Sequence, residues 1–434
     1  MARKVFISFL GTTDYSETQY LWADGTVSLP TRFIQEAILE KKAKDWTEND
    51  RVFIFYTNQS FKKNWRDKGQ KDKNNRLIKD GIHSIGLKTR LQNMGLKAKI
   101  RGFRMDDGHT EEQIWKIFEI VYTKLKSGDK IYFDMTHAFR SIPIFASTLF
   151  NFARFTKDIE VVSVHYGAFY ESKAEIVDMT NIIKLQNLLE AATSITEFGR
   201  VPQKILKNYE DFVSHDGKTM MDTIVKGIGD LDEYIQYNRL RDIEKGSYVK
   251  KMLENKKNFD SSDAILLPLR EVVNKVINRV MKLKFQQQRS DANIMAAIEW
   301  AKEYEMFPQA YTLAREYILS RITAHFKELN PYNLDAEKDN LKKFREYMSS
   351  IMGMSEKDVK MQYFQGELKE YEELTFFLLK DRLIKKMRNK DAYPKLVNYR
   401  NIINHAKGTE GYKSIKKAFD ISFNNCMTIL KNNK

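Results

Sequence analysis

Polar residues follow directly after several apolar runs in the N-terminal part of this sequence, and their types suit the binding of an anion. They are Gly11, Thr12 and Thr13 after the first run, Thr57 and Asn58 after the second, and Gly167 after the fifth. Hydroxyl and amide side chains beside exposed backbone N–H groups offer several hydrogen-bond donors at once. We therefore interpret these positions as candidate contacts to a phosphate or a nucleotide.

The segment after the fourth apolar run carries the strongest signal of this kind. It reads Asp134-Met135-Thr136-His137-Ala138-Phe139-Arg140-Ser141-Ile142-Pro143. An imidazole and a guanidinium three residues apart, beside the expected start of a helix, are poor material for an apolar core. They place positive potential next to backbone donors, which favours an anion. Thr136, His137, Arg140 and Ser141 are therefore candidate ligand-binding residues.

A second group of reactive side chains lies on a predicted helix near the C-terminus. Asp391 suits the N-cap of this helix, Pro394 its first turn and Gly408 its C-terminal end. Arg400 and His405 therefore fall in the last turns of one helix.

These residue types can cleave RNA without a metal ion. Such a reaction needs a group that transfers protons beside the 2′-hydroxyl and the leaving oxygen, and a cation beside the phosphate. His405 supplies the first near pH 7 and Arg400 the second, while Asn401 can orient the imidazole or bind phosphate. The sequence shows no cluster of residues beside them that would hold a metal ion.

The elements that must position the first group alternate between short apolar runs and segments of helical period. The predicted strands are Val5 to Phe9, Val52 to Tyr56, Ala98 to Phe103, Lys130 to Asp134, Glu160 to His165 and Ala174 to Val177. One helix is expected to begin near Ser28 with Pro30 in its first turn, and another at Thr110 with Gln113 at the capping-box spacing. This alternation predicts a mostly parallel, Rossmann-like α/β sheet, whose ligands lie at the carboxyl ends of its strands.

From residue 181 onward the pattern predicts an all-α region. Its helices are expected at Ile182 to Ala192, Ala264 to Leu283, Ile294 to Tyr304, Ala310 to Phe326, Leu368 to Met387, Tyr393 to Ala406 and Ser414 to Leu430. The polar, glycine-containing segment from Arg200 to Asp263 is interpreted as a connector or an insertion.

Composition narrows the class of protein further. The chain has 434 residues, with 73 Lys and Arg against 58 Asp and Glu, and a single cysteine, Cys426. One cysteine excludes a disulfide framework and a cysteine-based zinc site. No GxGxxG or GxxxxGK[ST] pattern supports a dinucleotide or P-loop enzyme. With no secretion signal and no membrane-length apolar stretch, we expect a cytoplasmic protein without membrane contact. The segment from Lys380 to Lys434 has more basic than acidic residues, which favours binding to a polyanion such as RNA.

With both groups present in this order, the chain resembles the CRISPR-associated CARF-HEPN ribonucleases of type III systems. The resemblance rests on Gly11-Thr12-Thr13, on residues 134–143 and on the RxxxxH pattern from Arg400 to His405. It covers residues 1–180, which correspond to the CARF domain, and residues 300–434, which correspond to the HEPN domain. Residues 181–299 would be a helical connector.

The resemblance implies that the first domain binds a cyclic oligoadenylate of four or six nucleotides and that the last one then cleaves single-stranded RNA. No other cofactor and no metal would be needed. The activator contacts carried over by position are Gly11, Thr12, Thr13, Thr57, Asn58, Thr136, His137, Arg140, Ser141 and Gly167. Arg400 and His405, with Asn401, would be catalytic.

Two other functions fit parts of the same sequence. A nucleotide-sensing regulator would use its helical region to bind DNA or a protein, and His405 would then have no role in activity. A ring nuclease would degrade the cyclic oligoadenylate itself through the strand-end residues, and replacing His405 would be harmless.

Helix geometry adds an expectation about assembly. Residues five apart on an α-helix are separated by about 140° around its axis and about 7.5 Å along it. Arg400 and His405 therefore do not converge on one phosphate within a single regular helix. We expect a homodimer, or a higher even-numbered oligomer, in which both copies contribute to one composite site. Distortion of the helix is the alternative.

Overall fold

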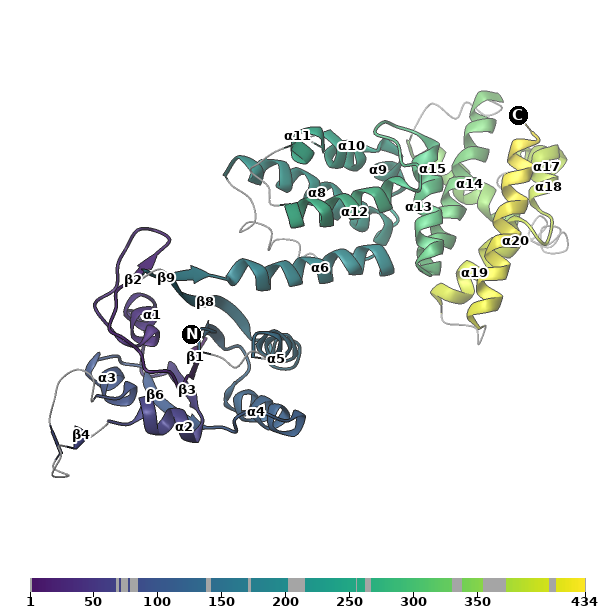
Figure 1. The fold of residues 1–434 in the computed structure, drawn as a ribbon. Helices are drawn as coiled ribbons and strands as arrows, with labels where there is room; N and C mark the ends of the chain where they lie inside the picture. The colour runs from purple at the N-terminus through teal and green to yellow at the C-terminus, as the bar shows by residue number, and fades with distance from the viewer. Residues whose placement is uncertain are drawn as a thin grey trace. The chain divides into compact units, whose positions relative to one another are not determined.

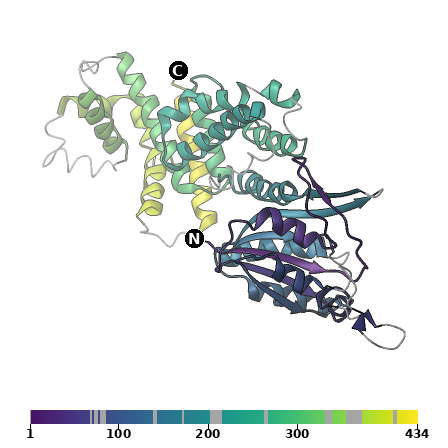
Figure 2. The same ribbon diagram turned by 90° about the vertical axis from the view of Figure 1, so that its left-hand side faces the viewer.

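The computed structural model describes residues 2–67, 70–71, 77–78, 85–137, 142–170, 173–201, 215–254, 256–261, 267–329, 338–353, 372–405 and 411–433. The chain divides into two compact units, Met1–Gln186 and Asn187–Lys434. Figures 1 and 2 show the ribbon from two sides: the first unit contains the β-sheet, and the second is built from helices. An N-terminal α/β sheet followed by a largely helical remainder agrees with the predicted layout.

Seven strands of the described residues form one sheet in the order β2-β9-β8-β7-β1-β3-β6. Their bounds are β1 Lys4–Leu10, β2 Tyr20–Trp22, β3 Arg51–Tyr56, β6 Lys99–Arg104, β7 Lys130–Asp134, β8 Glu160–Tyr170 and β9 Lys173–Asp178. The strands β8, β7, β1, β3 and β6 are mutually parallel, and β9 runs antiparallel to β8. Two short strands, β4 Gln70–Lys71 and β5 Leu77–Ile78, pair separately.

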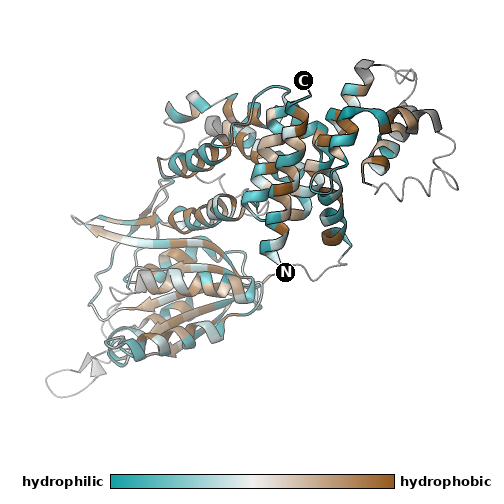
Figure 3. Cartoon of the chain, turned by 90° about the vertical axis from the view of Figure 1, so that its right-hand side faces the viewer, coloured by the Kyte–Doolittle hydropathy of each residue, from teal (hydrophilic) through white to brown (hydrophobic). Residues whose placement is uncertain are grey.

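Two hydrophobic cores lie on opposite faces of this sheet (Figure 1). One face is covered by α1 Ile34–Lys42 and α3 Leu87–Asn93, and the other by α4 Glu111–Lys124 and α5 Ile142–Lys157. The strands between them are coloured largely as hydrophobic in Figure 3. Burial on both faces explains why the central strands are nearly continuous apolar runs in the sequence.

The helix that starts at Thr110 was predicted correctly, but the one near Ser28 begins later. Thr110 caps α4 by accepting a hydrogen bond from the backbone N–H of Gln113. By contrast, the backbone N–H of Ser28 bonds to the carbonyl of Tyr20 at 2.9 Å. Because this backbone is engaged in a strand-like pairing, α1 starts only at Ile34.

Within the described residues, the second unit consists of helices. The first of them, α6, runs across the boundary between the two units. They are α6 Thr180–Phe198, α8 His215–Gln236, α9 Leu240–Lys245, α10 Ser247–Glu254, α11 Lys256–Ser261, α12 Leu267–Met281, α13 Asp291–Glu303, α14 Phe307–Leu329, α15 Lys338–Gly353, α17 Glu372–Lys380, α18 Arg382–Met387, α19 Tyr393–Asn404 and α20 Tyr412–Lys431. None of the described helices combines the length and hydrophobicity that crossing a membrane requires.

The polar segment interpreted as a connector or an insertion, residues 200–263, contains α8 to α11, whose apolar residues recur at helical spacing among the polar ones, and its role stays a prediction. One prediction about these helices was wrong. The single helix expected from Leu368 to Met387 is interrupted at Asp381, where the carboxylate accepts hydrogen bonds from the N–H groups of Leu383 and Ile384 and caps α18.

Candidate functional site

The order of the parallel strands places the switch point of the sheet between the ends of β1 and β7. In an open α/β sheet, connections leave in opposite directions at the point where the strand order reverses, and ligands bind there. Here the order reverses between β1 and β7, since β3 and β6 lie on one side and β8 on the other. We call the loops that follow these two strands, residues 11–15 and 135–137, the strand-end site.

Gly11 and His137 are brought together across this site. A Cβ atom added to Gly11 would lie 3.2 Å from Cβ of His137 and 2.5 Å from the hydroxyl oxygen of Tyr15. The ring centroids of Tyr15 and His137 are 4.4 Å apart, with the planes tilted by 35°. Glycine is therefore required at position 11 by the close approach of the two loops.

Burial makes the aromatic pair of this site neutral near pH 7. It lowers the pKa of His137 below its usual value, although the negative charge of Asp134 opposes the shift. It also raises the pKa of Tyr15, and here the charge of Asp134 adds to the effect. A neutral imidazole and a neutral phenol offer hydrogen-bond donors without a fixed charge.

A buried hydrogen-bond network fixes the loop after β7. The carboxylate of Asp134 accepts bonds from Ser8 Oγ at 2.7 Å and from Thr136 N and Oγ1 at 3.0 and 2.6 Å. Thr136 Oγ1 in turn accepts from Gly167 N at 2.8 Å, and Ser8 Oγ accepts from Gln35 Nε2 at 2.9 Å. The network thus ties β1, β7, β8 and α1 together, and it commits the hydroxyl proton of Thr136 to Asp134.

Gly167 lies inside a strand, whereas the sequence placed it in a loop. Strand β8 continues to Tyr170 because its second half pairs with β9, with Gly167 opposite Ile176. A Cβ at this glycine would lie 2.1 Å from Cδ1 of Ile34 and 3.2 Å from Cγ2 of Thr136. Gly167 therefore reaches the strand-end site through its backbone N–H group.

After β3 the chain forms a short helix, α2 Asn58–Ser60, and not an open loop. Thr57 is the N-cap of this helix and Asn58 is its first residue. Thr57 is buried, and its side chain accepts from the N–H of Ser60, while the hydroxyl of Ser60 accepts from the N–H of Thr57 at 2.9 Å. The hydroxyl of Thr57 is thus engaged as a helix cap, and Asn58 is exposed.

The structure adds two residues to the site that the sequence did not indicate: Tyr15, which packs on His137, and Asn64. After α2 the chain forms a π-helical turn, η1 Phe61–Trp65. Asn64 in this turn donates from Nδ2 to the carbonyl oxygens of Gly11 and Thr13, at 2.9 and 3.0 Å. A lone Asn within a run of basic residues carries no local signal, because its partners are about fifty positions away in the sequence.

The remaining predicted residues of the strand-end site are Thr12, Thr13, Arg140 and Ser141. Thr12 is half-buried and Thr13 is exposed. Arg140 and Ser141 lie outside the described residues.

The second candidate site lies at the C-terminal end of α19. Tyr393 and Leu396 bury one side of this helix, and the hydroxyl groups of Tyr393 and Ser349 are hydrogen-bonded at 3.0 Å. The N-cap is Ala392, not the predicted Asp391, whose carboxylate instead pairs with Lys395 at 3.0 Å.

The predicted catalytic residues surround this helix end. Arg400 Nη1 donates to Asn401 Oδ1 at 3.1 Å, and the backbone N–H of His405 bonds to the carbonyl of Asn401 at 3.0 Å. His405 is the C-cap and is exposed, whereas Arg400 is half-buried. Asn401 therefore holds the guanidinium and the last turn of the helix. Gly408 lies outside the described residues.

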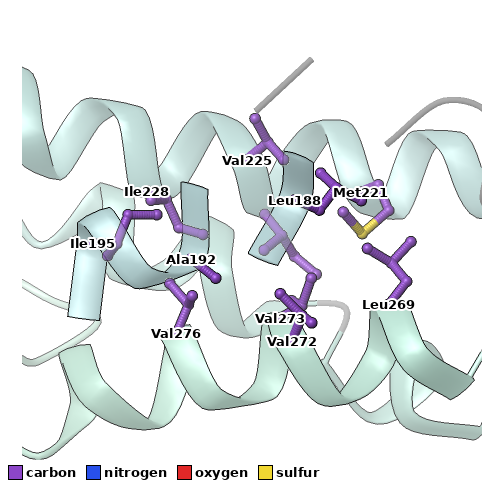
Figure 4. A pocket seen from close by; sticks show the side chains of 11 residues that line it. Leu188, Ala192, Ile195, Met221, Val225, Ile228, Leu269, Val272, Val273 and Val276 are labelled. Atoms are coloured by element: carbon purple, nitrogen blue, oxygen red, sulfur yellow. The ribbon is translucent and has the colours of Figure 1, made fainter. Parts of the chain in front are cut away.

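The second unit also contains a cavity, and its lining is apolar, unlike the two candidate sites. Figure 4 shows it between α6, α8 and α12. It is lined by Leu188, Ala192, Ile195, Met221, Ile224, Val225, Ile228, Leu269, Val272, Val273 and Val276. These side chains are all apolar, so the lining offers no side-chain donor to an anionic ligand. The part of the chain that the structure describes also contains no group of three or more His, Cys, Asp or Glu residues placed to hold a metal ion.

An α/β sheet with polar residues at its switch point, followed by a helical unit, is thus the class of protein that the fold defines. Over 305 residues, or 68% of its length, the chain is 24% identical to the CRISPR-associated protein MJ1674 of Methanocaldococcus jannaschii. The matched stretch spans 41% of that protein, so this chain covers about two fifths of its relative. No protein-family model matches the chain. The similarity supports an association with CRISPR.

Proposed function

We propose that this chain is a cyclic-oligoadenylate-activated, metal-independent endoribonuclease of CRISPR antiviral defence, with a CARF-like first unit and a HEPN-like C-terminal part. The similarity to a CRISPR-associated protein supports the cellular context. The activator, the RNA substrate and the chemistry are inferred from the two candidate sites.

The observation that carries the proposal is the convergence of Gly11, His137 and the Thr136–Gly167 pair at the switch point of the sheet. His137 and the backbone N–H groups of the loop after β1 suit a phosphodiester of a cyclic nucleotide, while the Thr136–Gly167 hydrogen bond keeps the neighbouring loop rigid. A rigid set of donors recognises phosphate oxygens without a dedicated ion pair. Arg140 would add charge to this set.

The helix-end residues support cleavage of RNA by transesterification. The 2′-hydroxyl oxygen attacks the adjacent phosphorus, the bond to the 5′-oxygen breaks, and the products carry a 2′,3′-cyclic phosphate and a 5′-hydroxyl. His405 transfers the protons, and Arg400 stabilises the negative charge that develops on the phosphate. Asn401 positions Arg400 through the hydrogen bond described above.

The proposal is tested by incubating the purified chain of residues 1–434 with a fluorescent single-stranded RNA and a panel of cyclic tri-, tetra-, penta- and hexa-adenylates. We expect cleavage with one ring size and little without it. His405→Ala and Arg400→Ala should abolish cleavage while the binding of the ring, measured by calorimetry, persists.

Two outcomes would favour the other functions. Loss of intact ring, unaffected by His405→Ala and without RNA cleavage, would identify a ring nuclease. Ring binding without degradation of either RNA or ring would instead indicate a nucleotide-sensing regulator.

A further inference from the structure

We infer that Asn64 is a positioning residue for the first ligand loop, residues 11–13, and that it turns the backbone donors of this loop toward the activator. The inference rests on the proposed function, since the ligand is the cyclic oligoadenylate of that proposal. It assigns to the π-helical turn η1 a role in binding that no predicted site residue supplies.

The argument starts from the two hydrogen bonds that Asn64 makes. Its Nδ2 donates to the carbonyl oxygens of Gly11 and Thr13, at 2.9 and 3.0 Å, so both protons of the amide are used. In a planar trans peptide the C=O and N–H groups point in opposite directions. Two carbonyls that face Asn64 therefore direct the N–H groups of Thr12 and Asp14 away from it. Alternate N–H groups on one side of a loop form the kind of concavity that holds a phosphate.

The π-helical turn is what brings Asn64 to this position. The N–H of Arg66 bonds to the carbonyl of Phe61, five residues earlier, at 3.3 Å. Trp65 then stacks on Tyr56 with ring centroids 5.2 Å apart. Such turns are rare and occur frequently at functional sites, because the additional residue redirects the side chains of the turn.

Asn64 is also held rigidly enough to act in this way. The residue is only 1% exposed, and its Oδ1 atom has no hydrogen-bond partner within the described residues. Burying an amide whose acceptor has no partner costs free energy, so such a residue is expected only where its donors make hydrogen bonds that the structure needs. The two carbonyls of the ligand loop are the partners that explain its presence.

Only a double donor satisfies this geometry, and that requirement provides a test. An ionised carboxylate at position 64 would face two carbonyl oxygens, which repel it. A protonated carboxyl group restores one donor, so Asn64→Asp should regain function as the pH falls. A residue that merely fills space would not produce this dependence on pH.

The experiment measures binding of the ring that the wild-type chain prefers, by calorimetry at about pH 7.5 and about pH 5.5, for Asn64→Ala and Asn64→Asp. Losing two hydrogen bonds that orient the loop should weaken binding about 5-fold to 100-fold in Asn64→Ala. Relative to the wild type at each pH, Asn64→Asp should bind more weakly at the higher pH and recover at the lower one. The backbone amide chemical shifts of Thr12 and Asp14 in the free protein should change in both variants at the higher pH, because the loop loses the bonds that orient it.

Asn293 provides a matched control in the second unit. It is fully buried, and its Nδ2 also donates to two backbone carbonyls, those of Glu244 and Gln288, at 3.1 and 2.9 Å. Asn293→Ala and Asn293→Asp should lose stability without changing ring affinity or the amide chemical shift of Thr12.

The results separate this inference from the proposed function. If the wild type binds the ring and both Asn64 variants bind it with the same affinity, the inference is overturned and the proposed function stands. If the wild type bound no ring, the function would fail, and unchanged amide chemical shifts of Thr12 and Asp14 in the free variants would overturn the inference independently. Should Asn64→Ala not fold, the pH comparison of Asn64→Asp decides.

Discussion

At the residue scale, the strand-end site is held mainly by polar side chains that bond to one another. Ser8, Gln35 and Asp134 are fully buried and hydrogen-bond to one another below the loop that contains Thr136, although Gln35 Oε1 has no partner within the described residues. Each unpaired group in such a network costs about 1 to 3 kcal/mol. His137, in the same loop, is left to meet a ligand, and Arg140 is predicted to join it.

The contribution of Arg140 can be measured directly. Replacing it by Ala should remove a charge-assisted contact worth about 1.5 to 3 kcal/mol, which weakens ring binding about 10-fold to 150-fold. Calorimetric titration of the variant provides the measurement. Arg51→Ala is a suitable control, because it removes the same charge at the opposite end of β3, where the guanidinium bonds only to backbone carbonyls. Unchanged affinity in Arg140→Ala would move the ligand site elsewhere.

His165 predicts a specific dependence of stability on pH. The residue is 1% exposed, and burial lowers its pKa to about 4, with the charges of Lys42 and Lys41 adding to the effect and Asp178 opposing it. An unfolded histidine titrates near pH 6.5 and so takes up its proton first as the pH falls. The stability due to neutral His165 is therefore complete above about pH 6.5 and is lost progressively down to about pH 4.

At about pH 4.5 this loss should amount to about 2 to 3 kcal/mol in the free energy of unfolding. Denaturant unfolding of the wild type and of His165→Phe between pH 7 and pH 4.5 isolates the effect, because other titrating groups are common to both. The variant should lose less stability over this interval. Parallel curves for the two proteins would contradict the assignment.

At the element scale, β6 and η1 pack closely because β6 has a glycine, Gly102, where they meet. A Cβ atom at Gly102 in β6 would lie 2.5 Å from both Cζ2 of Trp65 and Cε1 of Tyr56. The glycine thus leaves room for Trp65 to stack on Tyr56, and this stacking fixes the turn that carries Asn64.

Gly102→Ala should therefore disturb the π-helical turn. Overpacking of this kind costs about 1 to 3 kcal/mol, and the displacement of Trp65 should also weaken ring binding through Asn64. Thermal unfolding and calorimetry on the same samples measure the two effects. Gly353→Ala, where an added Cβ meets nothing within 4 Å, is the control. Wild-type stability and affinity in Gly102→Ala would show that the turn tolerates the added methyl group.

At the scale of the whole molecule, the proposed chemistry makes RNA cleavage independent of metal ions. Excess EDTA should leave activator-dependent RNA cleavage unchanged, because His405 and Arg400 supply proton transfer and charge stabilisation themselves. The products should end in a 2′,3′-cyclic phosphate or a 3′-phosphate. Loss of activity in EDTA with recovery in Mg²⁺ or Mn²⁺, or 3′-hydroxyl products, would show the mechanism to be wrong.

Assembly follows from the geometry of α19. Arg400 and His405 lie five residues apart, on opposite sides of the helix end, so one helix does not present both to the same phosphate. We predict an obligate homodimer in which Arg400 and His405 of two chains form a composite site. Light scattering of the active species should report a dimer or a larger even-numbered assembly.

A linked heterodimer tests the shared site more sharply. With His405→Ala in one chain only, independent sites predict half the wild-type activity, whereas a shared site predicts a larger loss. Retention of half the activity or more would therefore refute the composite site, as would a fully active monomer.

Sequence alone was sufficient where local pattern decides structure. The apolar runs of β1, β3 and β7 indicated a buried parallel sheet, and parallel strands necessarily bring the residues after them to one edge. Gly11, Thr136 and His137 could therefore be placed near one another before any coordinates. The same local logic located α4 through Thr110 and placed Arg400 near the end of α19.

Tertiary structure decided what depends on partners distant in sequence. Gly167 lies in a strand because β9 pairs with it, and α1 starts late because Ser28 pairs with Tyr20. Asn64 belongs to the strand-end site only because the π-helical turn carries it to Gly11, fifty-three positions earlier. A hydrogen bond of this kind joins two segments whose local patterns are independent, and only packing of the complete sheet brings the donor and the acceptor together.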